Sequence, residues 1–204
     1  MMREIRLYVE GGGDESQGKA RIREGVSRFL GPVVQRCREK RVRWNVIACG
    51  PRNAAYDAFC AAHRSHVGAT SLLLVDAEDP VRNEPWQHLR DRDRWTTERE
   101  LDSSYHLMVL TMESWLVADP DALERYYGKG FRRRALPPPE RVEGLPKAQV
   151  IDCLRRATEQ TKKGTYHKIR HGPEILGALD PNRVRRAAPH CDRLFQMLFA
   201  CLDS

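Results

Sequence analysis

The apolar residues of the chain predict four β-strands within its first 112 residues. Short runs rich in Val, Ile, Leu and aromatic residues occupy positions 4–9, 42–49, 70–79 and 104–112. The third run, TSLLLVDAED, stays apolar without interruption until it reaches three acids. Uninterrupted apolar runs are typical of strands that are buried on both faces, as in a parallel sheet.

Helical patterns separate these strands. Residues 18–40 and 54–63 carry apolar residues at helical spacing, and residues 113–128 follow the fourth strand. Within that last stretch, Asp119 is suited to cap a helix that begins at Pro120. The alternation of strands and helices predicts an α/β fold with a mostly parallel central sheet flanked by helices.

A change in composition after the fourth strand predicts three segments. Residues 1–130 form the α/β core, residues 131–146 are a Pro-rich connector, and residues 147–204 are a helical extension packed on the core. The pattern leaves open whether this extension covers the carboxyl ends of the strands or packs elsewhere.

Composition adds expectations about compartment and partners. The six cysteines form no CxxC pair, and the first residues are charged rather than apolar. We therefore expect reduced thiols and a cytoplasmic protein without an export signal or a membrane span. Lys and Arg exceed Asp and Glu by 35 to 28, which gives a net charge of +7. A polyanionic partner explains this excess, and so does an arginine-rich coding bias.

Acidic residues follow three of the four predicted strands. Glu10 ends the first strand, Asp76 lies at the end of the third, and Glu113 ends the fourth. Because the carboxyl ends of parallel strands meet at one edge of a sheet, we expect these acids to lie together there. Three more acids follow within a few residues of them, namely Asp14, Glu78 and Asp79.

Such a group of carboxylates favours a divalent cation. Two unit charges about 4 Å apart repel each other by about 4 kcal/mol at an effective dielectric constant of 20. Mg²⁺, Mn²⁺ or Ca²⁺ relieves this repulsion, because hard cations prefer oxygen ligands. In an extended segment Asp76 and Glu78 point the same way, so both can meet Glu10. Each acid alone fits a helix cap or an exposed turn equally well, whereas the three together favour a metal site.

Three glycines follow the first of these acids in the stretch YVEGGGDES, residues 8–16. The stretch lacks the Lys-Ser/Thr pair of a Walker P-loop and the glycine spacing of a dinucleotide-binding loop. An acidic, metal-binding turn is the remaining interpretation, in which the glycines let the backbone bend sharply after Glu10.

Two of these motifs together resemble the Toprim domain. VEGGGD is similar to its strand-end glutamate with glycine, and Asp76-Ala77-Glu78 in LLVDAED is similar to its later Asp-x-Asp. The last acid departs from the commonest Toprim form, so either Glu78 or Asp79 takes its place. Over most of its length the chain looks closer still to an uncharacterised bacterial Toprim-like family, numbered 4276 among domains of unknown function. The other motifs behind this resemblance are CGPRNAAYDAF, WQHL, HLMVLTMESWLVADPDAL and KGTYHK.

The resemblance implies phosphoryl-transfer chemistry on nucleic acid that depends on one or two Mg²⁺ or Mn²⁺ ions. By this analogy Glu10 and Asp76 hold the main ion, and Glu113 serves a second ion or acts as a general acid or base. The further candidate metal ligands are Glu78, Asp79 and Asp14. The class includes overcoming-lysogenization-defect-type nucleases, which act with ATPases. The implied partners are nucleic acid, chiefly DNA, an ATPase in a bacterial defence setting, and a second copy of the chain.

A basic segment, KKGTYHKIRHG at residues 162–172, supplies candidates for contacts to phosphate. Lys168 is the preferred catalytic residue, by analogy with the lysine of nuclease-type Toprim sites. The candidates for nucleic-acid binding are Lys163, His167, Arg170 and Arg52, the last of these in the turn after the second strand. An exposed basic loop without a ligand has the same composition.

These observations lead to two main hypotheses. The first hypothesis, which we favour, is an enzyme: a metal-dependent, phosphodiester-cleaving nuclease of the Toprim type. The second is a non-catalytic, metal- or nucleic-acid-binding regulatory subunit that retains the fold, and the departure at Glu78 favours it. Nucleotidyl transfer of the primase kind ranks below both, since the chain has no obvious second module for a nucleotide and a template.

Overall fold

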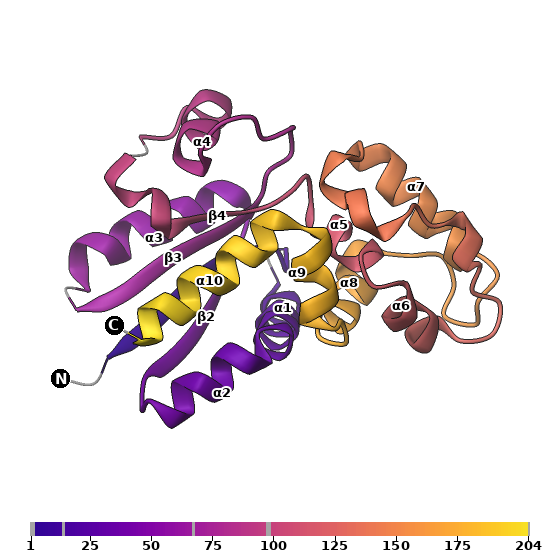
Figure 1. Ribbon diagram of the computed structural model, residues 1–204, viewed down its shortest axis with the longest axis horizontal. Coiled ribbons are helices and arrows are strands. Elements are labelled where there is room, and N and C mark those ends of the chain that lie inside the picture. Colours follow the sequence, from indigo (N-terminus) through magenta and orange to yellow (C-terminus); the bar gives the residue numbers. More distant parts are fainter. Residues whose placement is uncertain (1–2, 14, 67, 97–98, 204) are drawn as a thin grey trace.

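The centre of the protein is a sheet of four parallel strands in the order β2-β1-β3-β4. The computed structural model describes residues 3–13, 15–66, 68–96 and 99–203. The carboxyl ends of the strands share one edge of the sheet (Figure 1). The predicted α/β fold with a parallel central sheet is therefore confirmed. The strands are β1 (Glu4–Glu10), β2 (Arg43–Gly50), β3 (Ala69–Asp76) and β4 (Tyr105–Met108).

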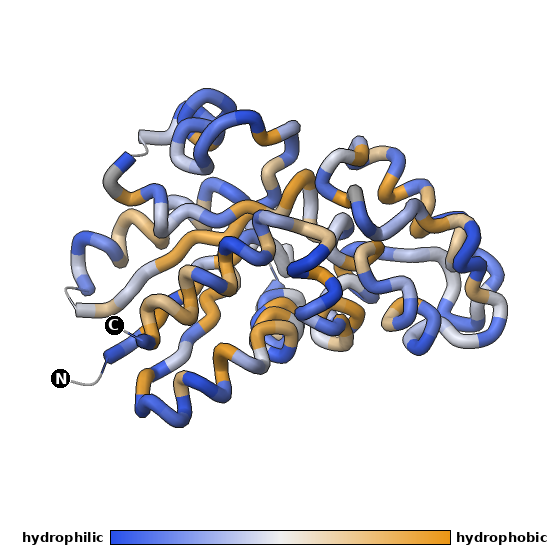
Figure 2. The backbone as a smooth tube through the Cα atoms, in the orientation of Figure 1, coloured by the Kyte–Doolittle hydropathy of each residue, from blue (hydrophilic) through white to orange (hydrophobic). Residues whose placement is uncertain are grey.

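Helices cover both faces of the sheet, which explains why the strands are apolar on both sides. Leu72 and Leu74 of β3 are buried against one group of helices, and Leu73 and Val75 are buried against the other. Burying one such side chain contributes about 1.5–3 kcal/mol. Figure 2 shows long hydrophobic stretches along the strands and more hydrophilic residues along the surrounding helices. The first face carries α1 (Ser16–Phe29), α2 (Gly31–Glu39) and α10 (Pro189–Asp203), and the second carries α3 (Arg52–Ser65) and α4 (Pro85–Asp93).

A group of shorter helices lies beyond the carboxyl ends of the strands (Figure 1). Trp115, Leu154 and Ile175 of this group belong to the same apolar core as the first face of the sheet. No helix among the described residues is long and apolar enough to cross a membrane. The predicted division at residues 130 and 146 stays a prediction. The group comprises α5 (Met112–Val117), α6 (Pro120–Tyr127), α7 (Lys147–Thr158), α8 (Lys168–Leu176) and α9 (Pro181–Ala187), with the 3₁₀ helices η2 (Arg133–Ala135) and η3 (Pro139–Gly144) between α6 and α7.

Three predicted elements differ from the structure. The strand predicted over residues 70–79 ends at Asp76. The helix predicted over residues 18–40 is two helices, because Pro32 has no N–H to donate and its ring disfavours a continuous helix. The strand predicted over residues 104–112 ends at Met108, and Glu113 therefore lies in the first turn of α5 rather than at the end of a strand. The predicted helix cap is confirmed, since the carboxylate of Asp119 accepts a hydrogen bond from the N–H of Ala122 at 3.2 Å.

The glycines after β1 are required by a close approach between this turn and α1. Gly12 has a φ angle of 88°, in the region that favours glycine. A Cβ atom on Gly18 would lie 2.0 Å from the carbonyl oxygen of Gly12. The turn and the first turn of α1 are therefore in direct backbone contact, and this contact fixes the chain next to Glu10.

Gly18→Ala is expected to destabilise the protein by about 1–3 kcal/mol, although alanine is the better helix former. The added methyl group would force the turn that carries Glu10 away from α1. Urea denaturation of the variant measures this loss. Gly31→Ala is the matched control, since a Cβ atom at Gly31 meets no neighbouring atom of the described residues within 4 Å. Equal stability of the two variants would contradict the expected backbone contact.

Candidate metal centre

Three carboxylates meet at the carboxyl edge of the sheet. Glu10 is the last residue of β1, Asp76 is the last residue of the neighbouring strand β3, and Glu78 follows two residues later. One oxygen atom of each side chain lies within 4.8 Å of the others. Asp76 is buried, whereas the side chains of Glu10 and Glu78 are partly exposed. The three acids therefore form a group that solvent reaches from one side, hereafter the acidic group.

Glu78 joins the acidic group through an unusual backbone conformation. Its φ angle is 66°, in the left-handed region, so the prediction that residues 76–78 are extended is wrong at this residue. Left-handed backbone costs a residue other than glycine about 1–2 kcal/mol. Backbone bonds to the end of β4 and to the segment after it hold this conformation, because the N–H of Ala77 donates to the carbonyl oxygen of Met108 and that of Glu78 donates to the carbonyl oxygen of Leu110. Strain of this kind is found at functional sites more often than elsewhere.

Arg52 fixes the Glu10 side of the acidic group. It is the first residue of α3, and its Nη1 atom donates to Glu10 Oε2 at 3.2 Å and to the carbonyl oxygen of Asp76. Two further bonds, of 2.9 and 2.7 Å, join the guanidinium to the carboxylate of Asp93. The guanidinium also lies over the ring of Trp95. Asp93 and Trp95 thus hold the guanidinium of Arg52 in place. The role of Arg52 in nucleic-acid binding stays a prediction.

Asp76 is the most enclosed member of the acidic group. Its Oδ1 atom accepts from the N–H of Met112 at 2.7 Å, and its Oδ2 atom accepts from Thr111 Oγ1 at 3.1 Å. Lys168 Nζ donates to the same Oδ2 atom at 2.9 Å. Lys168 is the first residue of α8, where the helix dipole disfavours a positive charge. Its position is explained by the acids that it faces, and α8 therefore covers the carboxyl edge of the sheet.

Glu113 lies behind Asp76 and is fully buried. Its Oε2 atom lies 2.6 Å from Thr111 Oγ1, so that the single hydroxyl hydrogen of Thr111 is shared between this oxygen and Asp76 Oδ2, and Oε2 lies 3.6 Å from Lys168 Nζ. Its Oε1 atom accepts from the hydroxyl group of Tyr166 at 3.0 Å. Thr111 thus links the two carboxylates, and the buried Glu113 holds both Thr111 and Lys168 in position. Its service to a second ion, or as an acid or base, stays a prediction.

Burial disfavours the charged form of these carboxylates. Burial raises the pKa of Glu10, and the neighbouring charge of Asp76 raises it further. Burial also raises the pKa of Asp76, despite its contact with Lys168. For Lys168, burial alone would lower the pKa, but the carboxylates of Asp76 and Glu113 outweigh this effect and raise it above its ordinary value. The lysine therefore stays charged, while the acids gain from any further cation.

Asp79 and the predicted basic residues of segment 162–172 other than Lys168 lie outside the acidic group. Asp79 pairs with Arg92 at 3.0 Å and is largely exposed, and Asp14 falls outside the described residues. Lys163 lies over the ring of Tyr126, with Nζ 4.6 Å from its centroid. The other two basic residues stay within the same segment: His167 caps α8 by accepting from the N–H of Arg170, and the Arg170 guanidinium donates to the carbonyl oxygen of Lys163.

Sequence reasoning missed three residues that contact these acids. Lys147 Nζ lies 2.6 Å from Glu78 Oε2, and Thr111 and Tyr166 hold Glu113 as described. Tyr166 and Thr111 lie in motifs that were already singled out, KGTYHK and HLMVLTMESW, and each is within two residues of a predicted site residue. Lys147 carries no such signal, because it comes directly after the Pro-rich connector and 69 residues after Glu78.

A cavity of about 230 Å³ adjoins the acidic group. Glu10, Asp76 and Lys168 line its polar side, and Ile22, Met108 and Met112 are among the apolar residues that line the rest. The glycines after β1 and Gly50 also face this cavity, where the absence of side chains leaves the backbone accessible. The cavity therefore has room for a small group such as a phosphate next to Lys168, provided that a cation offsets the charge of the carboxylates.

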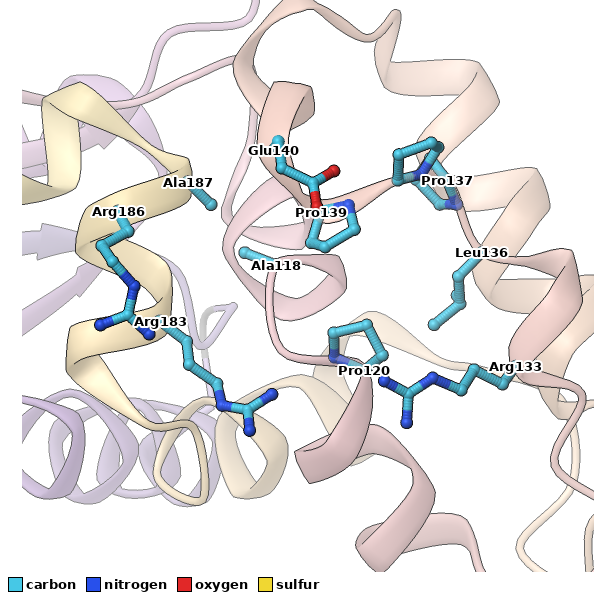
Figure 3. Close-up of a pocket in the computed structure, with 11 residues that line it drawn as sticks. Ala118, Pro120, Arg133, Leu136, Pro137, Pro139, Glu140, Arg183, Arg186 and Ala187 are labelled. Atoms are coloured by element: carbon cyan, nitrogen blue, oxygen red, sulfur yellow. The ribbon is translucent and has the colours of Figure 1, made fainter.

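A larger cavity of about 540 Å³ lies at the other end of α5 (Figure 3). Arg133 and Arg183 enter it from opposite sides, and prolines of the connector line its wall. Both arginines pair with the same acid, Asp121. A third arginine, Arg186, also lines this cavity, so its lining is mainly basic, unlike the acidic group.

A comparison with models of known protein families identifies the family of this chain. Residues 9–198 match the family described as Domain of unknown function (DUF4276). The matched segment includes the acidic group and the lysines that contact it. No curated protein matches the chain, and no solved structure does. The relation to the Toprim domain stays a prediction, whereas the match shows that the chain belongs to the DUF4276 family.

Proposed function

We propose that this protein is a Mg²⁺- or Mn²⁺-dependent nuclease of the Toprim type, which cleaves phosphodiester bonds of nucleic acid. The observation that carries the proposal is the acidic group itself. Carboxylates from two neighbouring strands and the following turn lie within 4.8 Å of one another, beside a charged lysine. A structural ion pair needs one acid, whereas three acids at a solvent-accessible sheet edge are the arrangement that a divalent ion needs.

The donor set and its spacing fit such an ion. Mg²⁺ takes oxygen ligands at about 2.1 Å, so two ligands on opposite sides of the ion are about 4.2 Å apart. Adjacent ligands of an octahedral ion are about 3 Å apart, so the oxygens of Glu10, Asp76 and Glu78 would move inward from separations of up to 4.8 Å. Since all three donors are carboxylates, Mg²⁺ and Mn²⁺ suit the group better than Zn²⁺, which favours His and Cys.

The residues around the acidic group have different roles in the proposed reaction. Once bound, the ion would polarise a phosphoryl oxygen and lower the pKa of a bound water. Lys168 stays charged and offsets the negative charge that develops on the phosphoryl oxygens. Thr111 and the N–H of Met112 orient Asp76, and Arg52 orients Glu10. An ATPase partner and a defence setting follow from the Toprim resemblance alone and are part of the proposal.

A regulatory subunit without catalytic activity is the second candidate, and one observation favours it. Each acid of the group already has a basic partner, since Glu10 contacts Arg52, Asp76 contacts Lys168, and Glu78 contacts Lys147. These cations let the group persist without an ion. A protein that only retains the fold would need nothing more.

Calorimetry with Mn²⁺, followed by cleavage assays on single- and double-stranded DNA and RNA, tests the proposal. We expect the wild type to bind Mn²⁺ and to cleave at least one of these substrates in its presence. Binding without cleavage would favour the regulatory subunit. The absence of any Mn²⁺ binding would overturn both the metal site and the nuclease.

Glu78→Gln is expected to weaken Mn²⁺ binding at least tenfold, because a neutral amide replaces one of the three carboxylates. Asp79→Asn is the matched variant and is expected to change the affinity less than twofold. The side chain of Asp79 is 64% exposed and pairs with Arg92 outside the acidic group. Calorimetry on the two variants decides which acid completes the Asp-x-Asp position. The reverse order of effects would assign that position to Asp79.

A further inference from the structure

Three basic residues contact the acidic group, and they differ in the number of other contacts that hold them in place. Arg52 is fixed by two bonds to Asp93, and Lys168 faces two buried carboxylates, Asp76 and Glu113. Among the described residues, Lys147 forms an ion pair with Glu78 alone. Glu78, with 24% of its side chain exposed, is the most exposed of the three acids, although the side chain of Lys147 (37%) is less exposed than that of Lys168 (46%).

Lys147 has no local reason to stand where it does. It is the first residue of α7, and a positive charge at the N-terminal end of a helix is opposed by the helix dipole. An acidic residue or a polar cap would suit this position better. Its partner Glu78 is likewise held in a disfavoured left-handed conformation. Two separate local penalties are therefore accepted so that the ammonium of Lys147 meets the carboxylate of Glu78.

The ammonium of Lys147 occupies the same carboxylate that an ion would need. Nζ lies 2.6 Å from Oε2 of Glu78, and the acidic group brings its oxygens within 4.8 Å of one another. A divalent ion that binds Glu78 gains more from the carboxylate than a single ammonium does, because its charge is twice as large. The ion and the ammonium of Lys147 therefore compete for Glu78. The ammonium can be displaced, because Glu78 is its one ion-pair partner among the described residues.

We propose that Lys147 is a further residue of this site, which neutralises Glu78 in the metal-free protein and contacts a phosphate of nucleic acid once an ion has displaced it. This inference rests on the proposed function and assigns it one more residue. The displaced ammonium stays at the end of α7, next to the acidic group. There it adds a positive charge for the backbone of the substrate, as lysines commonly do in nucleic-acid interfaces.

Mn²⁺ titration of Lys147→Met and Lys147→Arg tests the competition directly, without relying on activity. We expect Lys147→Met to bind Mn²⁺ about tenfold more tightly than the wild type, because no cation competes for Glu78. Lys147→Arg is expected to bind like the wild type. Lys129→Met, which removes an exposed lysine outside the acidic group, controls for the loss of one positive charge.

The second measurement is the affinity for DNA in Ca²⁺, as a function of salt. For Lys147→Met the slope of log affinity against log salt is expected to fall by about one, as for the loss of one phosphate contact. A merely structural ion pair would change thermal stability and leave both the Mn²⁺ affinity and this slope unaltered. Thermal melts confirm that each variant is folded, and Lys147→Gln, which also removes the charge and is expected to give the same changes, replaces the methionine variant should that one not fold.

The outcomes separate this inference from the proposed function. Mn²⁺ binding by the wild type with no gain in Lys147→Met would overturn the role of Lys147 and leave the metal site standing. Mn²⁺ binding by Lys147→Met alone would mean that no ion displaces Lys147 in the wild type, and would overturn both the displacement and the proposed function. If neither protein bound Mn²⁺, the metal site would fail and the role of Lys147 with it.

Discussion

Glu10→Gln is expected to stabilise the metal-free protein at neutral pH and, at the same time, to abolish its binding of Mn²⁺. The carboxylate of Glu10 accepts from Arg52 and from the N–H of Asp76 through its Oε2 atom, and a glutamine oxygen can accept both bonds. The neutral side chain removes the repulsion with Asp76 and the penalty of burying a charge, which are the causes that raise the pKa of Glu10. It also removes a ligand that the ion requires.

The pH dependence of stability follows from the direction of this shift. A carboxyl group whose pKa is raised by folding holds its proton more tightly in the folded state than in the unfolded state. Its contribution to stability is fully present below the pKa of the unfolded chain, near 4.5, and is lost as the pH rises through the raised pKa. The pKa of Asp76 is raised as well, so Asp76 contributes to the same loss of stability with rising pH. Glu10→Gln therefore removes only part of this loss. Mn²⁺ should oppose the decline in the wild type only.

Urea denaturation between pH 4 and pH 8, in EDTA or in Mn²⁺, measures both effects on the same protein. The wild type in EDTA should lose stability with rising pH more steeply than Glu10→Gln. Glu24→Gln is the control, because Glu24 lies exposed on α1 and pairs only with the exposed Arg28 among the described residues. A variant that is less stable than the wild type at neutral pH would show that Glu10 is held there for structure rather than for an ion.

The fold was largely predictable because its signals are local. The apolar run of β3 is buried on both faces as its composition predicted, and Asp119 caps the helix that begins at Pro120. The break at Pro32 was a local signal that the prediction overlooked, whereas the error after β4 came from tertiary contacts that prevail over local pattern. The chain after β4 stays apolar through Leu110, yet it turns early, because the N–H of Met112 bonds to Asp76 and the carbonyl of Leu110 pairs with Glu78. Asp76 and Glu78 are both distant in sequence from the segment that they contact.

The acidic group was predictable for a topological reason. Parallel strands bring their carboxyl ends to one edge, so acids at the ends of β1 and β3 must be neighbours once these strands pair. The basic side of the site follows no such rule. Lys168 was predictable only through the Toprim resemblance, and Lys147 not at all, since the placement of α7 and α8 over the edge depends on apolar packing among many helices.

Lys168→Met is expected to reduce cleavage by about 10²–10³-fold while Mn²⁺ binding is retained or strengthened. The ammonium lies 2.9 Å from Asp76 Oδ2 and lines the cavity in which a phosphate can approach the acidic group. Its raised pKa keeps it charged throughout the neutral range, so the loss should be independent of pH between 6 and 8. Single-turnover cleavage at saturating Mn²⁺ isolates this effect from ion binding. Lys168→Arg keeps the charge and is expected to retain part of the activity.

Lys163→Met is the matched control for this last variant, because it removes the same charge from the same basic segment. Lys163 lies over Tyr126, and no described contact joins it to the acidic group. Its loss is expected to weaken nucleic-acid binding in a salt-dependent manner and to leave the rate at saturating substrate within about threefold of the wild type. Equal losses for the two lysines would mean that the segment acts through its overall charge. A loss confined to Lys168 would place its ammonium beside the reacting phosphate.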